Sequence, residues 1–376
     1  MRRQSWIAAI AGLAVAFTPL GARGAQGPAQ PPCVSHRAGR VAAAYAQIVA
    51  QARALVCDRL VPGIPGLQVA VAVDGRLVWS EGFGYADLQR RRPVTRETQF
   101  RIGSVSKPLT ATAVALLYQQ GTLDLDAPVQ RYVPSFPDKG YVITTRELAG
   151  HLAGIRHYRD QEFLLNRHFN TVVEGLSIFE HDSLLSPPAT RFSYSSYGWN
   201  LISAVVEGAS GEDFLTYMRR HVFRPLGLAR TAPDRADSLM PDRTQFYDRD
   251  SAGRFTIAPP VDNSYKWAGG GFVSTAEDLV KFGSALLQAG FLKAETLDLL
   301  FTSQKTSAGE PTGYGIGWFL GSDSLSHRRV FHGGGAVGGT AAFGADRDSR
   351  VVVAILTNLS NASLDAGDRI PALFDR

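Results

Sequence analysis

Segments typical of β-strands lie near the two ends of this 376-residue chain, with helical patterns between them. Near the start, two apolar-rich runs at 66–73 and 76–85 flank Asp74-Gly75, which is a strong signal for a β-hairpin. Further strand-like runs occur near the other end, at 314–320, 328–335, 339–346 and 350–358. The pattern predicts one antiparallel sheet built from both ends of the chain.

Helical patterns indicate how this sheet is covered. Residues 40–60 have apolar positions at helical spacing, and a second helix is expected from Ser104 to a stop at Gly121. Ser274 or Thr275 is expected to cap a third helix. A further short helix is expected from about Leu364. The predicted fold class is therefore α/β (α+β), with sheet-domain segments 26–110 and 266–376 and a mostly helical domain at 111–265.

Charge and composition exclude some functions. The formal charge is +5, the pI is about 9.2, and the only dense basic run is residues 90–92. No basic face with interleaved aromatic residues is evident, so nucleic acid is not expected as a partner. A mildly basic, solvated surface is expected instead, with a small molecule or peptide as the substrate. Self-assembly cannot be judged from the sequence.

The first 25 residues resemble an export signal. A basic start, MRRQ, precedes the apolar run WIAAIAGLAVAF, and Ala22-Arg23-Gly24 offers a cleavage site. Twelve apolar residues are too few to span a bilayer, so no stable membrane anchor is expected. A cleaved signal peptide implies a periplasmic or secreted protein. A mitochondrial transit peptide is the alternative, because no acidic residue precedes Asp58.

The chain has two cysteines, Cys33 and Cys57. In an oxidising compartment they can form a disulfide that ties the N-terminal segment to the first helix. Alternatively, Cys57 is a small buried apolar residue and Cys33 is free. The sequence leaves both possibilities open.

Several common catalytic motifs are missing from the sequence. No serine is flanked as Gly-x-Ser-x-Gly, no pair of histidines has zinc-ligand spacing, and no phosphate-binding glycine loop is present. An α/β-hydrolase elbow, a zinc hydrolase and a nucleotide-binding enzyme are therefore not supported. We expect no metal and no cofactor.

Ser104 and Lys107 form a Ser-x-x-Lys motif in a chain that strongly prefers arginine. Of 39 basic residues only six are lysines. At the start of a helix the two side chains would lie one turn apart, with Ser104 in the positive field of free amides. A lysine can lose its proton and act as a base, whereas an arginine cannot. The alternative is a capping Ser104 with a solvated Lys107.

Two further segments favour the catalytic interpretation. Tyr194-Ser195-Ser196 precedes an apolar helical run, and His332-Gly333-Gly334-Gly335 lies on a predicted strand whose glycines would admit a substrate backbone. With these three motifs in this order, the sequence resembles the serine β-lactamase and penicillin-binding-protein superfamily in its class C-like branch. The resemblance covers roughly residues 60–360 and includes KWAGGGFVSTAEDLVKFG.

The resemblance implies a role for each motif residue. Ser104 matches the nucleophile, and Lys107 and Tyr194 match the pair that moves protons. His332 falls where the family has lysine, and Ser196 where it has asparagine. The amides of Ser104 and Gly335 would hold the oxyanion. A serine hydrolase working through an acyl-enzyme is therefore expected.

Two departures from the family pattern affect the expected substrate. Ser196 has no carboxamide, and His332 is often neutral near pH 7, which weakens a site for the carboxylate of a β-lactam. We expect poor β-lactamase activity and better activity on esters or small peptide amides. A phenol serves as a base only if its pKa is lowered, and Lys107 with a protonated His332 could lower that of Tyr194. The alternative function is a non-catalytic penicillin-binding-like or scaffold protein on the same fold.

Three residues near these motifs are not expected to take part in the chemistry. His151 and Gly154 are expected to be structural, and Trp267 could either line the substrate cleft or pack in the core. Specificity is expected to depend on the loops at 155–190 and 235–265.

Overall fold

The computed structural model describes residues 33, 35, 39–288, 290–323 and 326–375 of the chain. The expected signal segment, residues 1–25, lies outside the described residues. Among the described helices, none combines the length and the apolar character needed to cross a bilayer.

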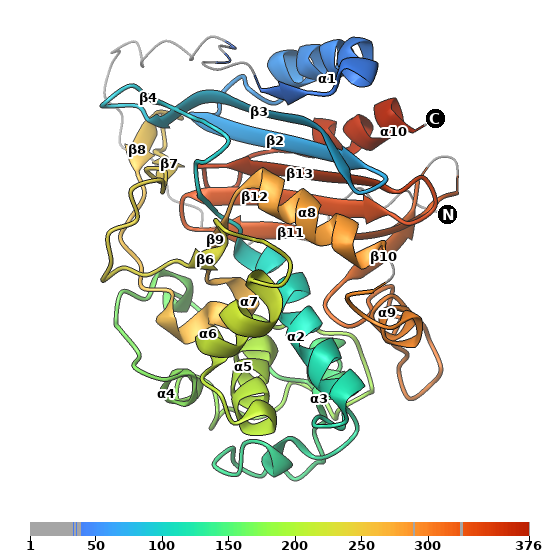
Figure 1. The fold of residues 1–376 in the computed structure, drawn as a ribbon. Coiled ribbons are helices and arrows are strands. Elements are labelled where there is room, and N and C mark those ends of the chain that lie inside the picture. Colours follow the sequence, from blue (N-terminus) through green and yellow to red (C-terminus); the bar gives the residue numbers. More distant parts are fainter. Residues whose placement is uncertain (1–32, 34, 36–38, 289, 324–325, 376) are drawn as a thin grey trace.

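An antiparallel sheet of eight strands forms the centre of the fold (Figure 1). Its strands come from both ends of the chain, which confirms the predicted architecture. Their order across the sheet is β1-β3-β2-β13-β12-β11-β10, and β4 pairs with β3. The strands are β1 (Arg40–Val41), β2 (Gly66–Val73), β3 (Arg76–Asp87), β4 (Arg92–Pro93), β10 (Phe319–Ser322), β11 (Arg328–Ala336), β12 (Gly339–Asp346) and β13 (Val351–Thr357).

The predicted hairpin is present as β2 and β3. Val73 pairs with Arg76 across Asp74 and Gly75, whose φ angles are 49° and 75°. Two successive left-handed residues match the twist of an antiparallel pair, and Asp-Gly adopts this conformation at low cost. The turn chemistry therefore fixes the register of the first two long strands.

Both faces of the sheet are buried. In β2, Leu67, Val69 and Val71 pack on one face, and Ala70 and Ala72 on the other. Successive side chains of a strand point to opposite faces, so this one run supplies two cores.

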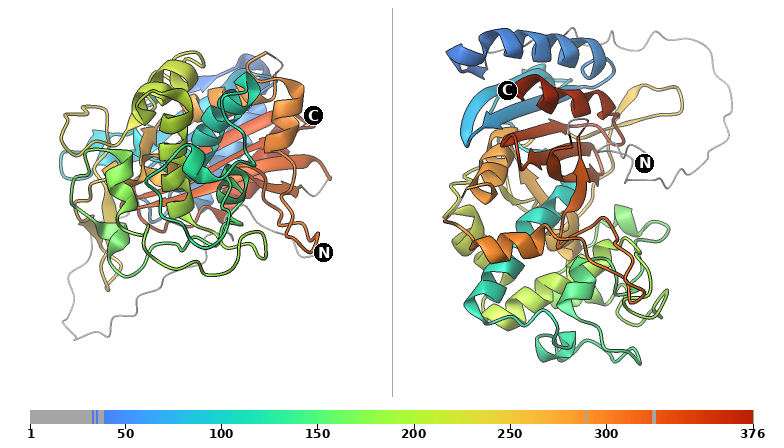
Figure 2. Two further views of the ribbon diagram at one scale, coloured as in Figure 1. Left: turned by 90° about the horizontal axis from the view of Figure 1, so that it is seen from below. Right: turned by 90° about the vertical axis from the view of Figure 1, so that its right-hand side faces the viewer.

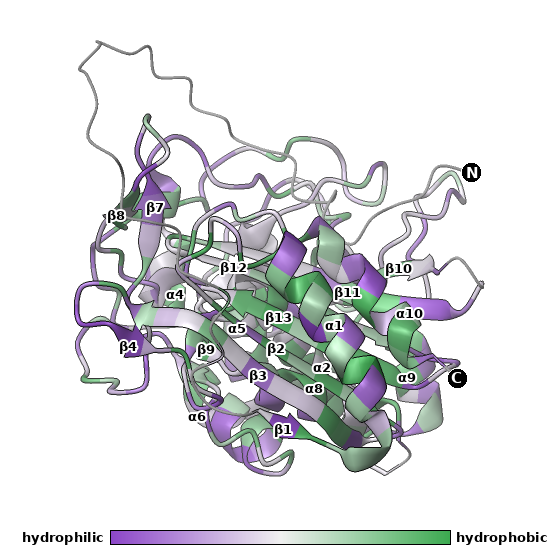
Figure 3. Ribbon diagram, turned by 90° about the horizontal axis from the view of Figure 1, so that it is seen from above, coloured by the Kyte–Doolittle hydropathy of each residue, from purple (hydrophilic) through white to green (hydrophobic). Residues whose placement is uncertain are grey.

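Helices α1 (Ala46–Arg59) and α10 (Ile370–Phe374) cover the first face, and α8 (Ala276–Leu286) covers the second (Figures 1 and 2). Seen from above α1, the strands β2 and β13 beneath it are hydrophobic (Figure 3). α1 begins later than the sequence predicted, because residues 40–41 pair with β3 instead of continuing the helix. Cys57 of α1 forms a disulfide with Cys33, which decides between the two alternatives.

The middle of the chain forms a mostly helical layer below the sheet (Figure 2). It is described by α2 (Ser106–Gln120), α3 (Thr145–Ala149), α4 (Val172–Leu176), α5 (Ser196–Ser210), α6 (Phe214–Tyr217), a π-helical turn (Met218–Phe223) and α7 (Trp267–Gly270). Helix α9 (Ala294–Leu300) lies beside it. α2 ends at Gly121, which has a φ of 77° as expected for a helix stop. The division into domains at residues 110 and 265 stays a prediction.

Two small sheets accompany these layers. One contains β5 (Phe100–Arg101), β9 (Phe272–Ser274) and β6 (Ala232–Pro233), and the other contains β7 (Tyr247–Arg249) and β8 (Phe255–Ile257). β5 leads directly into the turn that holds Ser104. Thr275, directly after β9, caps α8 by accepting a hydrogen bond from the amide of Asp278, as the sequence predicted.

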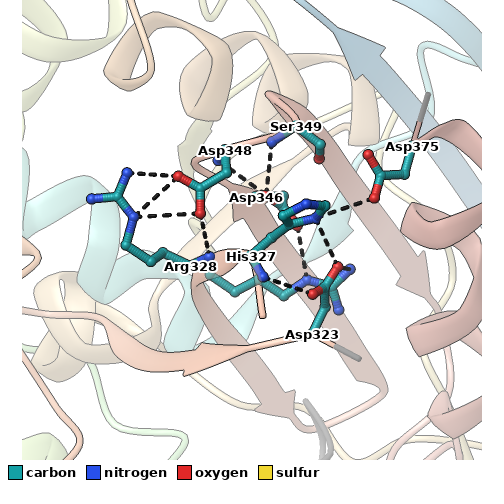
Figure 4. A network of polar contacts seen from close by, with 8 residues as sticks. Asp323, His327, Arg328, Asp346, Asp348, Ser349 and Asp375 are labelled. Carbon is teal, nitrogen blue, oxygen red and sulfur yellow. Dashed lines mark hydrogen bonds and ion pairs between the residues drawn. The ribbon is translucent and has the colours of Figure 1, made fainter. Parts of the chain in front are cut away.

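An ionic network lies at the end of the sheet where β10 and β12 finish and β11 begins (Figure 4). His327 Nδ1 lies 3.1 Å from a carboxylate oxygen of Asp323, 3.1 Å from one of Asp375 and 3.8 Å from one of Asp346. Arg329 Nε also lies 3.3 Å from Asp346. The imidazole therefore ties the last described residue to the start of β11 and the end of β12.

Candidate active site

Ser104 lies in a tight turn pressed against strand β11. The turn is a 3₁₀ helix, Gly103–Val105, that leads directly into α2. Gly103 has a φ of 49°, and a Cβ there would lie 2.4 Å from the carbonyl oxygen of Gly335. On the facing strand, a Cβ on Gly334 would lie 1.9 Å from the carbonyl oxygen of Ile102. Glycine on both segments thus allows the backbones to meet beside Ser104.

Gly335, the predicted second oxyanion donor, lies on β11 with its backbone close to Gly103. A Cβ placed on it would meet no atom within 4 Å, so the space in front of it is open. The glycines of β11 therefore act in two ways. Gly334 admits the protein's own backbone, and Gly335 leaves room beside Ser104 for a substrate carbonyl.

Lys107 is fully buried, which rules out the solvated lysine of the alternative interpretation. Its Nζ lies 2.9 Å from Ser104 Oγ, 3.1 Å from Ser196 Oγ and 2.7 Å from the carbonyl oxygen of Gly269. Among the described residues, no carboxylate forms an ion pair with it. Burial, together with the charge of the nearby Lys266, holds the pKa of the Lys107 ammonium well below its ordinary value.

In its neutral form, the amine of Lys107 has a hydrogen-bonding capacity that fits these three neighbours. Its two N–H groups can donate to Gly269 and Ser196, both of which offer oxygen acceptors. The remaining lone pair can then accept the hydroxyl proton of Ser104. The geometry therefore suits a general base for this serine.

Tyr194 and Ser196 complete the cluster from the start of α5. Ser195 caps the helix by accepting a hydrogen bond from the amide of Gly198 at 3.0 Å. This places Ser196 against Lys107, and the Tyr194 ring lies 4.9 Å from Lys107 Nζ. The structure thus brings all three sequence motifs together.

The protonation of Tyr194 differs from the sequence-based expectation. Burial raises the pKa of its phenol strongly, and the hydroxyls of Ser104 and Ser196 oppose this only in part. The expected lowering does not occur because the phenol is shielded from water. A neutral phenol is a proton donor at neutral pH, so Tyr194 suits a general acid.

His332 is buried and neutral, as expected for a histidine near pH 7, so no protonated imidazole lowers the pKa of Tyr194. Burial and the charge of Lys107 lower the pKa of His332 to about 3, although the Gly333 carbonyl opposes this. Its Nδ1 lies 2.6 Å from that carbonyl oxygen, and its Nε2 lies 3.1 Å from the hydroxyl of Tyr314. A proton on Nδ1 therefore leaves Nε2 as the acceptor for Tyr314.

Two histidines that the sequence left outside the site hold its tyrosine segment in place. His151 Nδ1 accepts a hydrogen bond from the amide of Ser195, and His157 Nδ1 accepts one from the amide of Ser196, each at 3.1 Å. Burial is the first cause that lowers the pKa of His157 to about 4 and that of His151 well below its ordinary range. Both imidazoles are therefore neutral acceptors. The structural role expected of His151 agrees with this contact.

The sequence-based prediction of the site also missed Lys266, although one sequence signal pointed to this residue. It is one of only six lysines and directly precedes Trp267 in KWAGGG, a stretch already associated with the family. Trp267 itself packs in the core cluster with 7% of its surface exposed. Tyr314 was visible only as part of a predicted strand.

Comparisons with known proteins agree with this geometry. The family model described as Beta-lactamase matches residues 44–375. The human protein "Serine beta-lactamase-like protein LACTB, mitochondrial" is 34% identical, over 74% of this chain and 68% of its own length. A D-aminopeptidase of Gluconobacter oxydans is 27% identical, over 74% of this chain and 52% of its own length.

Solved structures show the same relationship. The octameric penicillin-binding protein homologue from Pyrococcus abyssi superposes with a TM-score of 0.72 at 26% identity, covering 87% of this chain and 76% of that one. The family match spans most of the chain and includes all the motif residues described above. The chain belongs to the Beta-lactamase family.

Proposed function

We propose that this serine hydrolase cleaves small peptide amides or esters through an acyl-enzyme formed on Ser104. The observation that carries the proposal is the contact of 2.9 Å between Ser104 Oγ and the buried Lys107 Nζ. A serine hydroxyl is a weak nucleophile until a nearby base removes its proton. A buried lysine with a lowered pKa is such a base.

The reaction follows from the positions of these groups. The Ser104 proton passes to Lys107 Nζ while Oγ attacks the substrate carbonyl carbon. The amides of Ser104 and Gly335 stabilise the negative oxygen that forms. When the carbonyl re-forms, the bond to the leaving group breaks, and the proton taken up by Lys107 passes to that group, either directly or with Tyr194 donating its own proton and regaining one from Lys107. Water then attacks the acyl-enzyme by the reverse route and releases the acid.

The neutral His332 supports a substrate without the carboxylate of a β-lactam at that position. A lysine on this strand would offer a fixed positive charge, whereas His332, with a pKa of about 3, offers none near pH 7. The printed name of the D-aminopeptidase relative supports an amide bond as one target. The class C-like assignment within the family is part of the same proposal.

Covalent labelling tests this function directly. A fluorophosphonate probe should label the wild-type protein and fail to label Ser104→Ala, with Ser106→Ala as the matched control for a serine on the same turn. A wild-type protein that is not labelled would instead favour the non-catalytic scaffold. Nitrocefin and p-nitrophenyl ester turnover, measured side by side, separates the substrates. Efficient nitrocefin hydrolysis would contradict the proposed preference.

A positive charge introduced at position 332 tests the proposed preference for substrates without a carboxylate. His332→Lys should lower KM for nitrocefin relative to the neutral ester, because it restores a cation near the substrate carboxylate. His332→Gln keeps the polar character without the charge and serves as the control. An equal effect of both variants on the two substrates would argue against this role of His332.

We also propose export through the N-terminal segment, in accordance with its basic and apolar regions. Mass determination of the mature N-terminus after expression in a Gram-negative host tests this. Cleavage near Ala22-Arg23-Gly24 is the expected result, and an intact N-terminus would contradict it.

A further inference from the structure

Lys266 is a buried lysine beside the active site whose ammonium has no anionic partner. Only 3% of its surface is exposed. Among the residues that the structure describes, no group accepts a hydrogen bond from its ammonium and no carboxylate lies within ion-pair distance. It ends the 3₁₀ turn Ser264–Lys266, directly before α7, which supplies the Gly269 carbonyl to Lys107. A buried charge without a counter-charge is costly unless a ligand compensates it.

Aromatic rings surround this ammonium and leave it without a strong hydrogen-bond acceptor. Its Nζ lies 4.4 Å from the ring centre of Phe163, 5.1 Å from that of Tyr265 and 5.7 Å from that of Tyr158. Such rings attract a cation through their electron-rich faces. They hold the ammonium in position and do not neutralise it.

The acidic residue whose charge acts on Lys266, Asp234, already has other partners. Asp234 accepts hydrogen bonds from Arg101 Nε at 2.6 Å, Arg243 Nη1 at 2.7 Å and Asn263 Nδ2 at 2.7 Å. Two guanidinium groups thus share one carboxylate, and Lys266 adds a further positive charge. Burial and the charge of Arg101 lower the pKa of Lys266 to about 7, against the opposite effect of Asp234. A bound carboxylate would raise that pKa and favour the ammonium.

The position of Lys266 differs from that of the family's strand lysine. A row of rings separates it from His332. The ring centres of His332 and Tyr194 are 6.3 Å apart, those of Tyr194 and His157 are 5.6 Å apart, and those of His157 and Tyr158 are 4.5 Å apart. Lys266 lies beyond Tyr158, close enough that its charge influences Lys107 and His157.

From this arrangement we propose that Lys266 forms an anion subsite, which binds a carboxylate on the substrate at the opposite end of this ring row from His332. The subsite rests on the proposed function of Ser104 as the nucleophile. It deepens that function by naming an acidic substrate class. It also accounts for a buried lysine that, among the described residues, has no carboxylate within ion-pair distance.

Matched substrates test the subsite. One pair is the mono-p-nitrophenyl ester of adipic acid and p-nitrophenyl hexanoate, which differ by a carboxylate in the acyl group. The other pair is the hexanoyl thioesters of thioglycolic acid and thioglycolamide, which differ by a carboxylate in the leaving group. The readout is the ratio of kcat/KM for the anionic and the neutral member of each pair. Because changes in the environment of Lys107 affect both members, they cancel in this ratio.

Lys266→Met should lower this ratio about tenfold to a hundredfold for one pair, mainly through KM, because a charge-assisted hydrogen bond is lost. Lys266→Arg keeps the charge and should restore part of the ratio. Lys293→Met removes an exposed lysine and should leave it unchanged. An unchanged ratio in Lys266→Met for both pairs would overturn the subsite.

Fluorophosphonate labelling separates this result from failure of the proposed function. A wild-type protein that labels at Ser104 but shows no dependence of the ratio on Lys266 retains the hydrolase function and loses the subsite. A wild-type protein that does not label removes the basis of both. Circular dichroism of each variant confirms that it is folded.

Discussion

The histidines of the active site and the histidine of the C-terminal network experience opposite environments. His157 and His332 are buried among rings and amides, and burial with the charge of Lys107 lowers the pKa of each, to about 4 and about 3. At His327, burial acts in the same direction, but Asp323, Asp375 and Asp346 together raise its pKa. The same side chain is therefore neutral in one region and favours the charged form in the other.

The difference depends on where the carboxylates are. The C-terminal network concentrates acidic groups around one imidazole (Figure 4). Around Ser104, by contrast, neither Lys107 nor Lys266 pairs with an acidic residue among those described. A carboxylate beside Lys107 would hold it as an ammonium and remove the base. The exclusion of acidic residues from this site is thus a requirement of the proposed chemistry.

Lys107→Arg should have the largest effect, because arginine stays charged and cannot release its proton to act as a base. We expect kcat/KM for a p-nitrophenyl ester to fall about a thousandfold, within the range usual for loss of a general base. Lys281→Arg, at an exposed lysine that donates to the Gly227 carbonyl, is the matched control. Retention of more than a tenth of the activity in Lys107→Arg would contradict the proposed role of Lys107 as the base.

The second-largest effect should come from acid, which destabilises the fold by protonating His157. The pKa of His157 in the folded protein lies below its ordinary value of 6.5, so its contribution to stability is complete above that pH. This contribution is lost as the pH falls toward about 4, and amounts to on the order of 3 kcal/mol. His157→Gln keeps an acceptor for the Ser196 amide and cannot be protonated in this range. The variant should therefore lose less stability between pH 6.5 and 4 in urea unfolding.

His181→Gln, at an exposed histidine, provides the control substitution for this measurement. Equal slopes for wild type and His157→Gln would show that the buried imidazole is not the group that titrates.

His327→Gln should have the smallest effect and the opposite pH dependence. A pKa raised in the folded state gives stability that is complete below the unfolded value of 6.5 and is lost as the pH rises through the folded value. The variant should therefore be less stable than wild type at pH 5.5 and nearly equal to it at pH 8.5. A thermal-unfolding difference that is the same at both pH values would contradict the role of the three carboxylates.

Local chemistry made much of the fold predictable. The Asp74-Gly75 turn, the stop of α2 at Gly121 and the cap at Thr275 each depend on a few neighbouring residues, and all three are present. The start of α1 was missed because pairing of residues 40–41 with β3 is a long-range contact. A local periodicity contains no information about such a contact.

The residues of the candidate site could be predicted from the sequence, but their protonation states could not. The motifs identified Ser104, Lys107 and Tyr194 because their spacing follows from the start of a helix and from a recognisable family pattern. The neutral state of His332 and the lowered pKa of Lys107 depend on burial, and so does the protonated phenol of Tyr194. Burial is a property of the packed molecule, so the sequence suggested a lowered pKa for the Tyr194 phenol that the structure corrects.

The sequence by itself determined the order of strands and helices and pointed to the candidate nucleophile and its lysine, because these follow from residue types at short spacing. Only the tertiary structure decided the disulfide between Cys33 and Cys57, and the amide contacts of His151 and His157. It also placed Lys266 beside the site without an acidic partner. These features join residues far apart in the chain, and their energies depend on which groups water can no longer reach.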